Sequence, residues 1–308
     1  MIVTRLSGGI GNQLFQYAAG RSLASRLGTG LVLDSSWIRG RHGGLPGAVR
    51  RYELACFDLD ARLVRAERVA RLPPRTRVGF KLRPWLPSLG RPTLHVLIEE
   101  ARTEPDARFF SAPDDTYLNG LWHSERYFEA HADEVRARLA FVPPLEGTNA
   151  ELARRIEAAV SVALHVRRGD YVTEPETRAV AGVLDERWYR RALDVVAARA
   201  GGAEVFVFSD EPEWCRANLD LGRPATFVAG NAGPAAFEDL RLMTRCRHHV
   251  IANSTFSWWG AWLGERPGSV VVAPEPWRLD GSGGYVVPAR WHRLERAGAA
   301  AASAGGAA

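Results

Sequence analysis

Two adjacent arginines, Arg167 and Arg168, stand where an apolar run gives way to a turn, and their type suggests chemistry directly. Residues 160–166 are typical of a buried strand, and Gly169 follows the arginine pair. Guanidinium groups at a strand end, beside a glycine, can donate paired hydrogen bonds to a phosphate. The alternative is a surface pair, because Lys81 is the only lysine and 39 of the 40 basic residues are therefore arginine. The position at a strand end favours a functional pair.

Two further predicted strands end in polar groups. Ser209 and Asp210 close one strand, where they suit either a cap for the next helix or a bond to a ribose hydroxyl. Residues 253–255 close another strand and open a helix, whose first N–H groups suit a phosphate or a plain cap. Since ligands bind at the carboxyl ends of parallel strands, the three strand ends together predict a site for a nucleoside diphosphate.

Several protein classes are excluded by what the sequence lacks. There is no G-x-x-x-x-G-K-[ST] run of a P-loop hydrolase, and Gly9-x-Gly11 lacks the third glycine of the dinucleotide fingerprint. Cys56, Cys215 and Cys246 stand far apart without a C-x-x-C pair, so neither a disulfide framework nor a thiolate zinc site is indicated. Among enzymes that bind a nucleoside diphosphate, these exclusions leave one that acts on a nucleotide sugar.

The elements that position these groups alternate between strands and helices. The start of the chain predicts a strand at residues 1–6, a helix at 12–27 and a strand at 31–34, with a glycine turn between the first strand and the helix. The second half predicts strands at 160–166, 204–209, 225–228, 249–252 and 270–273, and helices at 185–200, 211–219, 234–246 and 254–263. Apolar strands between helices indicate doubly wound parallel α/β sheets. Trp258 and Trp262 share a face of the last helix and are expected in the core.

This alternation and the chain length predict two Rossmann-like domains with the site in a cleft between them. Pro and Gly cluster at residues 141–147, so we expect domains at residues 1–145 and 146–296, followed by a low-complexity tail at 297–308. The stretch from about residue 72 to 113, which is rich in Pro and Arg, predicts loops and short helices.

Composition and charge narrow the class of protein further. The chain has 308 residues, 46% of them hydrophobic and 24% charged, without a signal-peptide pattern or a membrane-spanning run, so we expect a soluble cytoplasmic protein. The net charge is +5, yet residues 50–85 alone hold 10 basic and 4 acidic residues. That stretch is either a solvated face or a surface for a phosphate-bearing ligand or acidic lipids. Nucleic acid is not expected as a partner, because no zinc-finger, RNP or helix-turn-helix signature accompanies the arginines.

Five ordered blocks resemble the bacterial and animal α-1,2-fucosyltransferases, and the resemblance spans about residues 1 to 277. The first, third and fifth blocks look like the signature blocks of that family, and the third is shared more loosely with other GDP-fucose transferases. The blocks are residues 8–17 (GGIGNQLFQY), 117–128 (YLNGLWHSERYF), 165–171 (HVRRGDY), 208–215 (FSDEPEWC) and 253–260 (NSTFSWWG).

The resemblance implies a GT-B-like fold, in which two Rossmann-like domains face a central cleft. It implies GDP-fucose as the donor, no metal or other cofactor, and inversion at the sugar carbon. Fucose would be placed on the 2-hydroxyl of a terminal galactose in a glycan acceptor. Donor binding would lie in the second domain and acceptor binding largely in the first.

Residue roles follow from this resemblance and from the chemistry of each group. Arg167 would stabilise the charge on the departing GDP, and Asn12 would orient the acceptor or the fucose. Asp170 is the nearest carboxylate for the base, but it could instead hold an arginine, and the departing phosphate could itself take the proton. Gly11 and Gln13 are expected on the acceptor side of the cleft. The expected donor-binding residues are His165, Arg168, Ser209, Asp210, Glu238, Asp239, Asn253, Ser254, Thr255 and Phe256.

Alternative roles stay open for some of these residues and for the whole chain. Asp210 and the Glu238-Asp239 pair suit ribose or guanine, although the latter pair also fits a solvated helix face, and Arg168 could pair with an internal acid. The whole chain could be a transferase using another nucleotide sugar, such as GDP-mannose, or another acceptor. It could also be a catalytically silent nucleotide- or glycan-binding protein. The basic residues 50–85 add the hypothesis of peripheral docking at the anionic inner face of a membrane.

Overall fold

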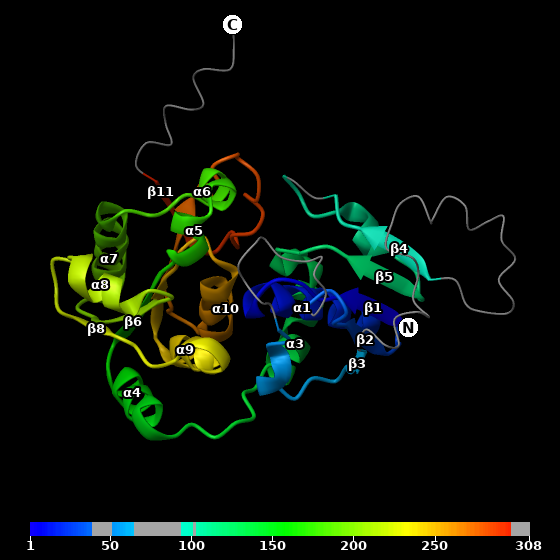
Figure 1. Cartoon of the computed structure of the whole chain (residues 1–308), viewed down its shortest axis with the longest axis horizontal. Coiled ribbons are helices and arrows are strands. Elements are labelled where there is room, and N and C mark those ends of the chain that lie inside the picture. Colours follow the sequence, from blue (N-terminus) through cyan, green and yellow to red (C-terminus); the bar gives the residue numbers. More distant parts are fainter. Residues whose placement is uncertain (39–50, 65–93, 101–102, 297–308) are drawn as a thin grey trace, which may run out of the picture. The chain divides into compact units, whose positions relative to one another are not determined.

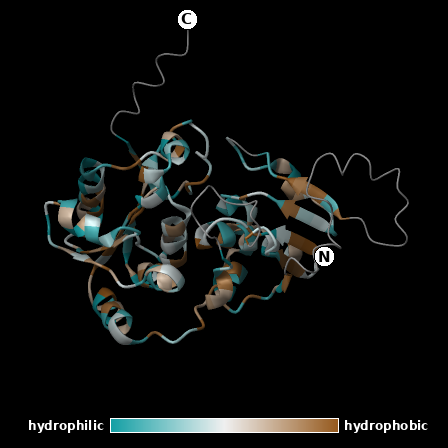
Figure 2. Cartoon of the chain, in the orientation of Figure 1, coloured by the Kyte–Doolittle hydropathy of each residue, from teal (hydrophilic) through white to brown (hydrophobic). Residues whose placement is uncertain are grey.

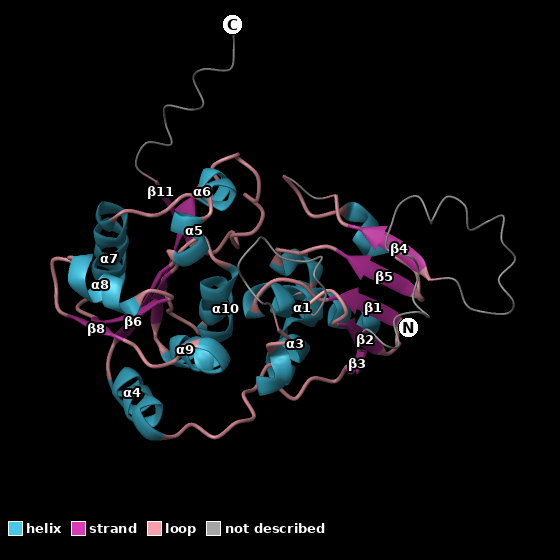
Figure 3. Ribbon diagram, viewed as in Figure 1, coloured by secondary structure: helices cyan, strands magenta, loops and turns pink. Residues whose placement is uncertain are grey.

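The chain forms two compact α/β units, each built on a parallel sheet (Figures 1 and 3). The computed structural model describes residues 1–38, 51–64, 94–100 and 103–296. The first unit comprises Met1–Ala101 and Pro105–Ala140, and the second comprises Arg102–Glu104 and Phe141–Ala308. The predicted α/β class with two parallel sheets is confirmed. The predicted tail at 297–308 and most of the basic stretch at 50–85 lie outside the described residues.

The first unit holds a five-stranded sheet in the order β3-β2-β1-β5-β4, in which the strand order reverses between β1 and β5. Every pairing in this sheet is parallel, with Val3 opposite both Val32 and Tyr117. The elements are β1 (Ile2–Arg5), α1 (Ile10–Arg26), β2 (Leu31–Asp34), η1 (Leu54–Cys56), β3 (Arg62–Val64), β4 (His95–Ile98), η4 (Ala107–Ser111), β5 (Thr116–Asn119), η5 (Glu125–Tyr127), η6 (Glu129–His131) and α3 (Ala132–Arg138).

The predicted strand–turn–helix–strand start of this unit is confirmed by β1, α1 and β2. Gly8 makes the turn with a φ of 72°, in the left-handed region that glycine adopts without strain. Helix α1 is buried along most of its length, including the polar side chains of Gln13 and Gln16. Because these amides cannot reach water, they must bond within the protein, and this places them in the scaffold of the turn.

One expectation for the first unit is corrected. Strand β4 lies in the stretch from residue 72 to 113, where the sequence predicted only loops and short helices. It is a short edge strand that pairs with β5 alone, with Leu97 opposite Leu118. Four residues with one buried side chain are too few to produce a visible periodicity. The 3-10 helix η4, in the same stretch, agrees with the expected short helices.

The second unit holds a six-stranded sheet in the order β11-β10-β9-β6-β7-β8, again entirely parallel. Its helices and strands are α4 (Gly147–Ala158), β6 (Ser161–Val166), α5 (Gly169–Thr173), α6 (Pro175–Ala181), α7 (Glu186–Ala200), β7 (Glu204–Ser209), α8 (Pro212–Asn218), β8 (Ala225–Phe227), η7 (Gly233–Ala235), α9 (Ala236–Arg245), β9 (His248–Val250), α10 (Thr255–Gly264), β10 (Val271–Glu275) and β11 (His292–Glu295). The five predicted strands and four predicted helices are all present, within a few residues at each end.

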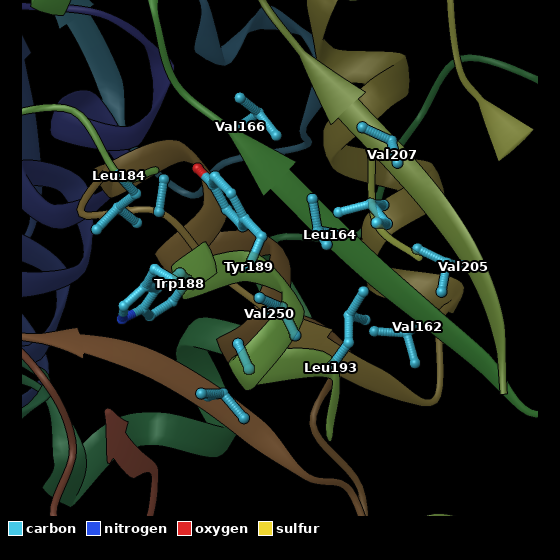
Figure 4. Packing of buried hydrophobic residues seen from close by; sticks show 14 of the residues in the cluster. Val162, Leu164, Val166, Leu184, Trp188, Tyr189, Leu193, Val205, Val207 and Val250 are labelled. Atoms are coloured by element: carbon cyan, nitrogen blue, oxygen red, sulfur yellow. The ribbon is translucent and has the colours of Figure 1, made fainter. Parts of the chain in front are cut away.

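The core of this unit lies on both faces of its sheet, as doubly wound packing requires. Along β6, Val162, Leu164 and Val166 join one buried cluster with residues of α7, such as Trp188 (Figure 4). Ala163 points to the opposite face, in a second cluster with residues of α4 and α9. Because successive side chains of a strand alternate between faces, a strand covered on both sides is apolar throughout. Helix α4, covered on one side only, shows hydrophilic and hydrophobic stretches (Figure 2).

Helix α10 is buried beside the same sheet and carries three tryptophans. Trp258, Trp259 and Trp262 are at most 1% exposed, and the indole N–H of Trp258 donates to the carbonyl of Val286 at 2.9 Å. The rings of Trp258 and Trp262 stack at 6.1 Å. The prediction that these tryptophans pack in the core is confirmed.

Candidate functional site

The strand order of the second sheet reverses between β6 and β9, and this is where ligands bind in open parallel sheets. The neighbouring strands β6, β7 and β9 all present their carboxyl ends at the same edge. The structure brings to this edge six of the predicted site residues, Arg167 and Arg168 after β6, Ser209 and Asp210 at the end of β7, and Asn253 and Ser254 after β9.

Arg167 is held between two carboxylates at this edge. Its Nη2 donates to Asp170 Oδ1 at 2.6 Å, and its Nη1 lies 3.1 Å from Asp210 Oδ2. The guanidinium carbon also lies 5.6 Å from the ring centre of Tyr171. Burial acts against the charge of Arg167, but the two carboxylates outweigh it and raise the pKa of Arg167. Arg167 is therefore a fixed cation, aimed by its partners.

Asp210 ties together the loop that follows β6. Its Oδ1 accepts the backbone N–H of Arg168 at 3.0 Å, while its Oδ2 faces Arg167. Burial raises the pKa of Asp210 against the attraction of Arg167. Ser209 accepts the backbone N–H of Glu211 at 3.0 Å, a turn contact within the loop. In the part of the chain that is described, both residues bond to protein groups that shape the arginine loop.

Arg168 points to an internal acid, one of the two roles that the sequence allowed. Its Nε donates to Glu211 Oε2 at 2.8 Å, and its guanidinium lies 3.3 Å from the ring centre of Trp214. Stacking on an indole and pairing with a carboxylate fix this side chain in the protein. Arg167 and Arg168 thus have different surroundings, although they are adjacent in the chain.

His165 lies inside β6 and is 3% exposed. Burial and the nearby charge of Arg167 lower its pKa to about 3, so the imidazole is neutral at physiological pH. Its Nδ1 is buried with no hydrogen-bond partner among the described residues, and its ring packs at 5.5 Å from that of Phe256 on α10. His165 can therefore donate or accept one hydrogen bond, but it adds no positive charge to the site.

Asn253 anchors the segment that follows the arginine loop. Its Nδ2 donates to the carbonyls of Ala181 at 2.7 Å and Trp277 at 3.2 Å. Its own backbone carbonyl accepts the Tyr171 hydroxyl at 2.8 Å. A buried arginine, Arg296, donates to the same Ala181 carbonyl at 2.7 Å. These bonds hold both ends of the α5–α6 segment against the strand ends.

Helix α10 begins at Thr255, with Ser254 as its N-cap residue. The Ser254 hydroxyl makes no capping bond to the first turn, and the Trp258 N–H already bonds the Ser254 carbonyl at 3.0 Å. A helix N-terminus carries partial positive charge and unpaired N–H donors, which favour an anion. Phe256, in the first turn, packs on His165 and so links α10 to the end of β6.

Glu238 and Asp239 form a second cluster in the first turn of α9. Asp239 Oδ1 accepts the Asn231 amide at 2.7 Å, and Asn231 exchanges amide bonds with Asn149 at 2.9 and 3.0 Å. Burial raises the pKa of Asp239 to about 6 and also raises that of Glu238. Glu238 is 12% exposed and lies 3.5 Å from Arg241. Both side chains are thus partly buried on this face of α9.

In the first unit, the predicted acceptor-side residues occupy the first turn of α1. Gln13 is buried, and its amide donates to the carbonyls of Gly8 at 2.9 Å and Arg51 at 2.8 Å. Its Oε1 accepts the Glu53 N–H at 3.0 Å, so Gln13 holds the turn together. Gly11 is buried beside it. Asn12 Oδ1 lies 3.1 Å from His123 Nε2, in the loop after β5.

A carboxylate of the protein occupies the start of α1. Glu53 Oε2 accepts the Ile10 N–H at 2.7 Å, which supplies a negative charge where the helix dipole favours one. The first turn of α10 itself contains no acidic residue. Of the two helix N-termini that follow glycine or serine turns, the one in the second unit is the better candidate for a diphosphate.

The sequence also contains one D-x-D run, Asp58-Leu59-Asp60, a pattern whose carboxylates can hold a divalent ion on a diphosphate. It precedes β3, at the amino edge of the first sheet, whereas Asn12 follows the carboxyl end of β1. Asp60 Oδ2 lies 3.5 Å from Arg21 and 3.6 Å from Arg138. These arginines account for the Asp60 charge, so the run belongs to the scaffold of the first unit.

Three residues with clear roles were missed by the site predictions from sequence. Glu53 and His123 contact the turn at the start of α1, and Tyr171 ties α5 to the carbonyl of Asn253. His123 and Tyr171 lie inside the quoted blocks, which was a usable signal. Glu53 lies outside these blocks, and only the tertiary structure reveals its contact with the start of α1.

Comparisons with known proteins agree with the resemblance. The family model described as glycosyl transferase family 11 matches residues 99–281, more than half of the chain. An α-1,2-colitosyltransferase from Escherichia coli is 31% identical over 96% of this chain and 99% of its own length. The O-antigen biosynthesis glycosyltransferase WbnK from Escherichia coli is 31% identical over 88% of this chain and 93% of its own length.

More distant matches complete the comparison. The galactoside α-(1,2)-fucosyltransferase 1 of Saimiri boliviensis boliviensis is 29% identical over 47% of this chain and 42% of its own length. Among solved structures, fucosyltransferase NodZ from Bradyrhizobium matches with a TM-score of 0.47 and 16% identity, over 84% of this chain and 91% of that one.

The described residues contain neither a membrane-spanning helix nor a cluster of metal-binding side chains. Within residues 1–38, 51–64, 94–100 and 103–296, no helix is long and apolar enough to cross a membrane. The same residues contain no group of three or more His, Cys, Asp or Glu side chains arranged to hold a metal ion.

Proposed function

The chain belongs to glycosyl transferase family 11, and we propose that it transfers L-fucose from GDP-fucose to the 2-hydroxyl of a terminal galactose in a glycan. The observation that carries this proposal is Arg167, held by Asp170 and Asp210 at the carboxyl edge of β6. Two relatives, named α-1,2-colitosyltransferase and galactoside α-(1,2)-fucosyltransferase 1, share the 1,2 linkage in their names, which supports the choice of the 2-hydroxyl.

The proposed reaction is a single displacement that inverts the sugar carbon. The acceptor 2-oxygen bonds to C1 of fucose from one face, while the bond from C1 to the β-phosphate oxygen breaks on the other. The electron pair of that bond leaves with GDP, and the Arg167 guanidinium and the α10 N-terminus stabilise it. The hydroxyl proton passes to the departing phosphate or to Asp170. We propose that no metal is required, because these groups supply the positive charge.

The charges around Arg167 determine how the diphosphate enters. Asp170 contacts Nη2 of the guanidinium and Asp210 contacts Nη1, so an anionic donor that binds through either nitrogen competes with a carboxylate. Asp210 is fixed by a second bond, to the Arg168 N–H, whereas Asp170 stands on the five-residue helix α5. We therefore propose that Asp170 yields to the diphosphate and that Asp210 keeps Arg167 in place.

The remaining donor contacts are assigned from position and chemistry. Ser254 and Thr255 would bind the same diphosphate through the start of α10, and neutral His165 would support them. The carboxylates of Glu238 and Asp239 suit the N1–H and amino donors of guanine, and both side chains are partly buried. On the acceptor side, Asn12 would orient the galactose or the fucose, and Gly11 and Gln13 would hold its turn.

A second donor is favoured by one comparison. The relative that matches 96% of this chain is named a colitosyltransferase, and colitose is fucose without its 3-hydroxyl. The same diphosphate and guanine contacts would serve both GDP-sugars. Rates with GDP-fucose and GDP-colitose, compared at equal concentration, decide between them, since a site that hydrogen-bonds the 3-hydroxyl rejects the sugar that lacks it.

The test of the proposed function is GDP release from GDP-fucose, with and without lactose, in EDTA, for the wild-type protein and for Arg167→Ala. We expect release that depends on lactose, survives EDTA and collapses in the variant, with the linkage then read from the product by NMR. Binding of GDP-fucose without any stimulation by a β-galactoside would refute the acceptor assignment. Absence of GDP-fucose binding would refute the donor, and loss of activity in EDTA would refute metal independence.

A further inference from the structure

The loop after β5 contains a backbone conformation that a large side chain rarely adopts. Trp122 has a φ of 56°, in the left-handed region, and its side chain is fully buried. Steric clash makes this region unfavourable for bulky residues, so the surrounding structure must hold it there. Such residues cluster at functional sites, where the strain places a neighbouring group.

A half-buried carboxylate holds this loop. Glu99, just after β4, accepts the N–H of Leu121 at 2.7 Å and that of Trp122 at 2.9 Å through one oxygen. The Tyr127 hydroxyl donates to its other oxygen at 3.2 Å. The Trp122 indole packs on Tyr127 at 5.2 Å between ring centres. The conformation of Trp122 is therefore fixed from both its backbone and its side chain.

The strained loop delivers His123 to Asn12. The first sheet reverses its strand order between β1 and β5, and the two residues follow these two strands. The Nε2 of His123 lies 3.1 Å from Asn12 Oδ1, and its ring packs 5.1 Å from that of Phe15. On the other side, the Asn12 amide fits against Gly8, where any added methyl group would collide with its Nδ2. The amide is held from both sides.

We propose that His123 is a positioning residue for the reaction, and that its Nε2–H fixes the amide of Asn12 by donating to Oδ1. Because Oδ1 can only accept, the contact selects the Nε2–H tautomer and turns Nδ2 toward a defined direction as the donor for the sugar. A glutamine at this position can donate from nearly the same place, whereas a phenylalanine keeps only the packing on Phe15. The inference rests on the proposed role of Asn12 in transfer.

The test compares four single variants and one double variant. We expect His123→Phe to lower kcat/KM for the acceptor by about 10- to 100-fold, the range typical of a misplaced catalytic group, and to leave GDP affinity unchanged. His123→Gln should stay within about threefold of wild type. His131→Phe is the matched control, since His131 belongs to the same unit but bonds Ser22 at 3.0 Å. In the Asn12→Ala background, His123→Phe should cause no further loss, because it acts through Asn12.

Equal losses in His123→Gln and His123→Phe would overturn the proposal, since the hydrogen-bond donor that glutamine restores would then have no effect. Additive losses in the double variant would overturn it too. A ¹⁵N NMR measurement of the His123 tautomer gives a readout independent of activity, and a proton on Nδ1 with a bare Nε2 would contradict the contact with Oδ1. If the wild-type protein transfers no sugar, the proposed function fails, while the NMR result still decides whether His123 holds Asn12.

Discussion

Gly169 and Asp210 approach so closely that a methyl group on Gly169 would lie 2.5 Å from Asp210 Oδ2. Gly169 begins α5, directly after the arginine pair, and Asp210 directly follows the neighbouring strand β7. The missing side chain lets the carboxylate reach both the Arg168 N–H and the Arg167 guanidinium. Asp210 occupies the space that a side chain at residue 169 would need, and this explains the glycine in the block at residues 165–171.

We expect Gly169→Ala to displace Asp210 and to loosen Arg167. GDP should bind about tenfold more weakly, equivalent to about 1.4 kcal/mol, as measured by isothermal titration calorimetry. Gly202→Ala is the control, because nothing lies within 4 Å of the added methyl group. Unchanged GDP affinity in Gly169→Ala would mean that Asp210 does not position the donor site.

Neutralising each of the two carboxylates that contact Arg167 should change the affinity for GDP in opposite directions. Asp170→Asn removes the group that competes with the diphosphate, so GDP should bind several-fold more tightly. Asp210→Asn removes the group that aims Arg167, so GDP should bind more weakly. Titration calorimetry on both variants measures the difference, and a shift in the same direction for both would contradict the assigned exchange.

Asp239 should make the stability of the chain depend on pH. Burial raises its pKa from 3.8 to about 6, so the folded chain holds a proton that the unfolded chain has lost. Its stabilising contribution is complete below about pH 4 and is lost as the pH rises through about 6, a change on the order of 3 kcal/mol. Asp239→Asn should therefore unfold at a higher urea concentration than wild type at pH 8, with a flatter profile between about pH 4 and 6.

The control for this prediction is Asp58→Asn, since Asp58 is exposed in the first unit. It should keep the wild-type profile. If Asp239→Asn lost stability on raising the pH just as wild type does, another group would be responsible.

The basic stretch at residues 50–85 should bind acidic lipid vesicles. We expect sedimentation with phosphatidylglycerol vesicles at low salt and release at high salt, because exposed charges are screened by salt. Vesicles of phosphatidylcholine alone are the control. Equal sedimentation with both, or with neither, would refute peripheral docking at an anionic inner membrane face.

The loops of the proposed donor site were largely predictable, because local sequence carries their signal. The continuous apolar run of β6 marks a strand covered on both faces, and the residues after it must lie at the carboxyl edge of the sheet. The same reasoning located Ser209, Asp210 and Asn253. Short edge strands such as β4 were not predictable, since four residues with one buried side chain leave no periodic pattern.

By itself, then, the sequence determined the α/β class, the strand–turn–helix–strand start of the first unit, five strands and four helices of the second unit, and the blocks that carry the polar residues. The tertiary structure decided their partners. Nothing local distinguishes Arg167, which two carboxylates hold, from Arg168, which pairs with Glu211. Asn12 and His123 stand 111 residues apart, and they meet only because β1 and β5 are neighbours in the sheet. Periodicity is a property of neighbouring residues, whereas an ion pair or a side-chain contact depends on the order in which distant strands assemble.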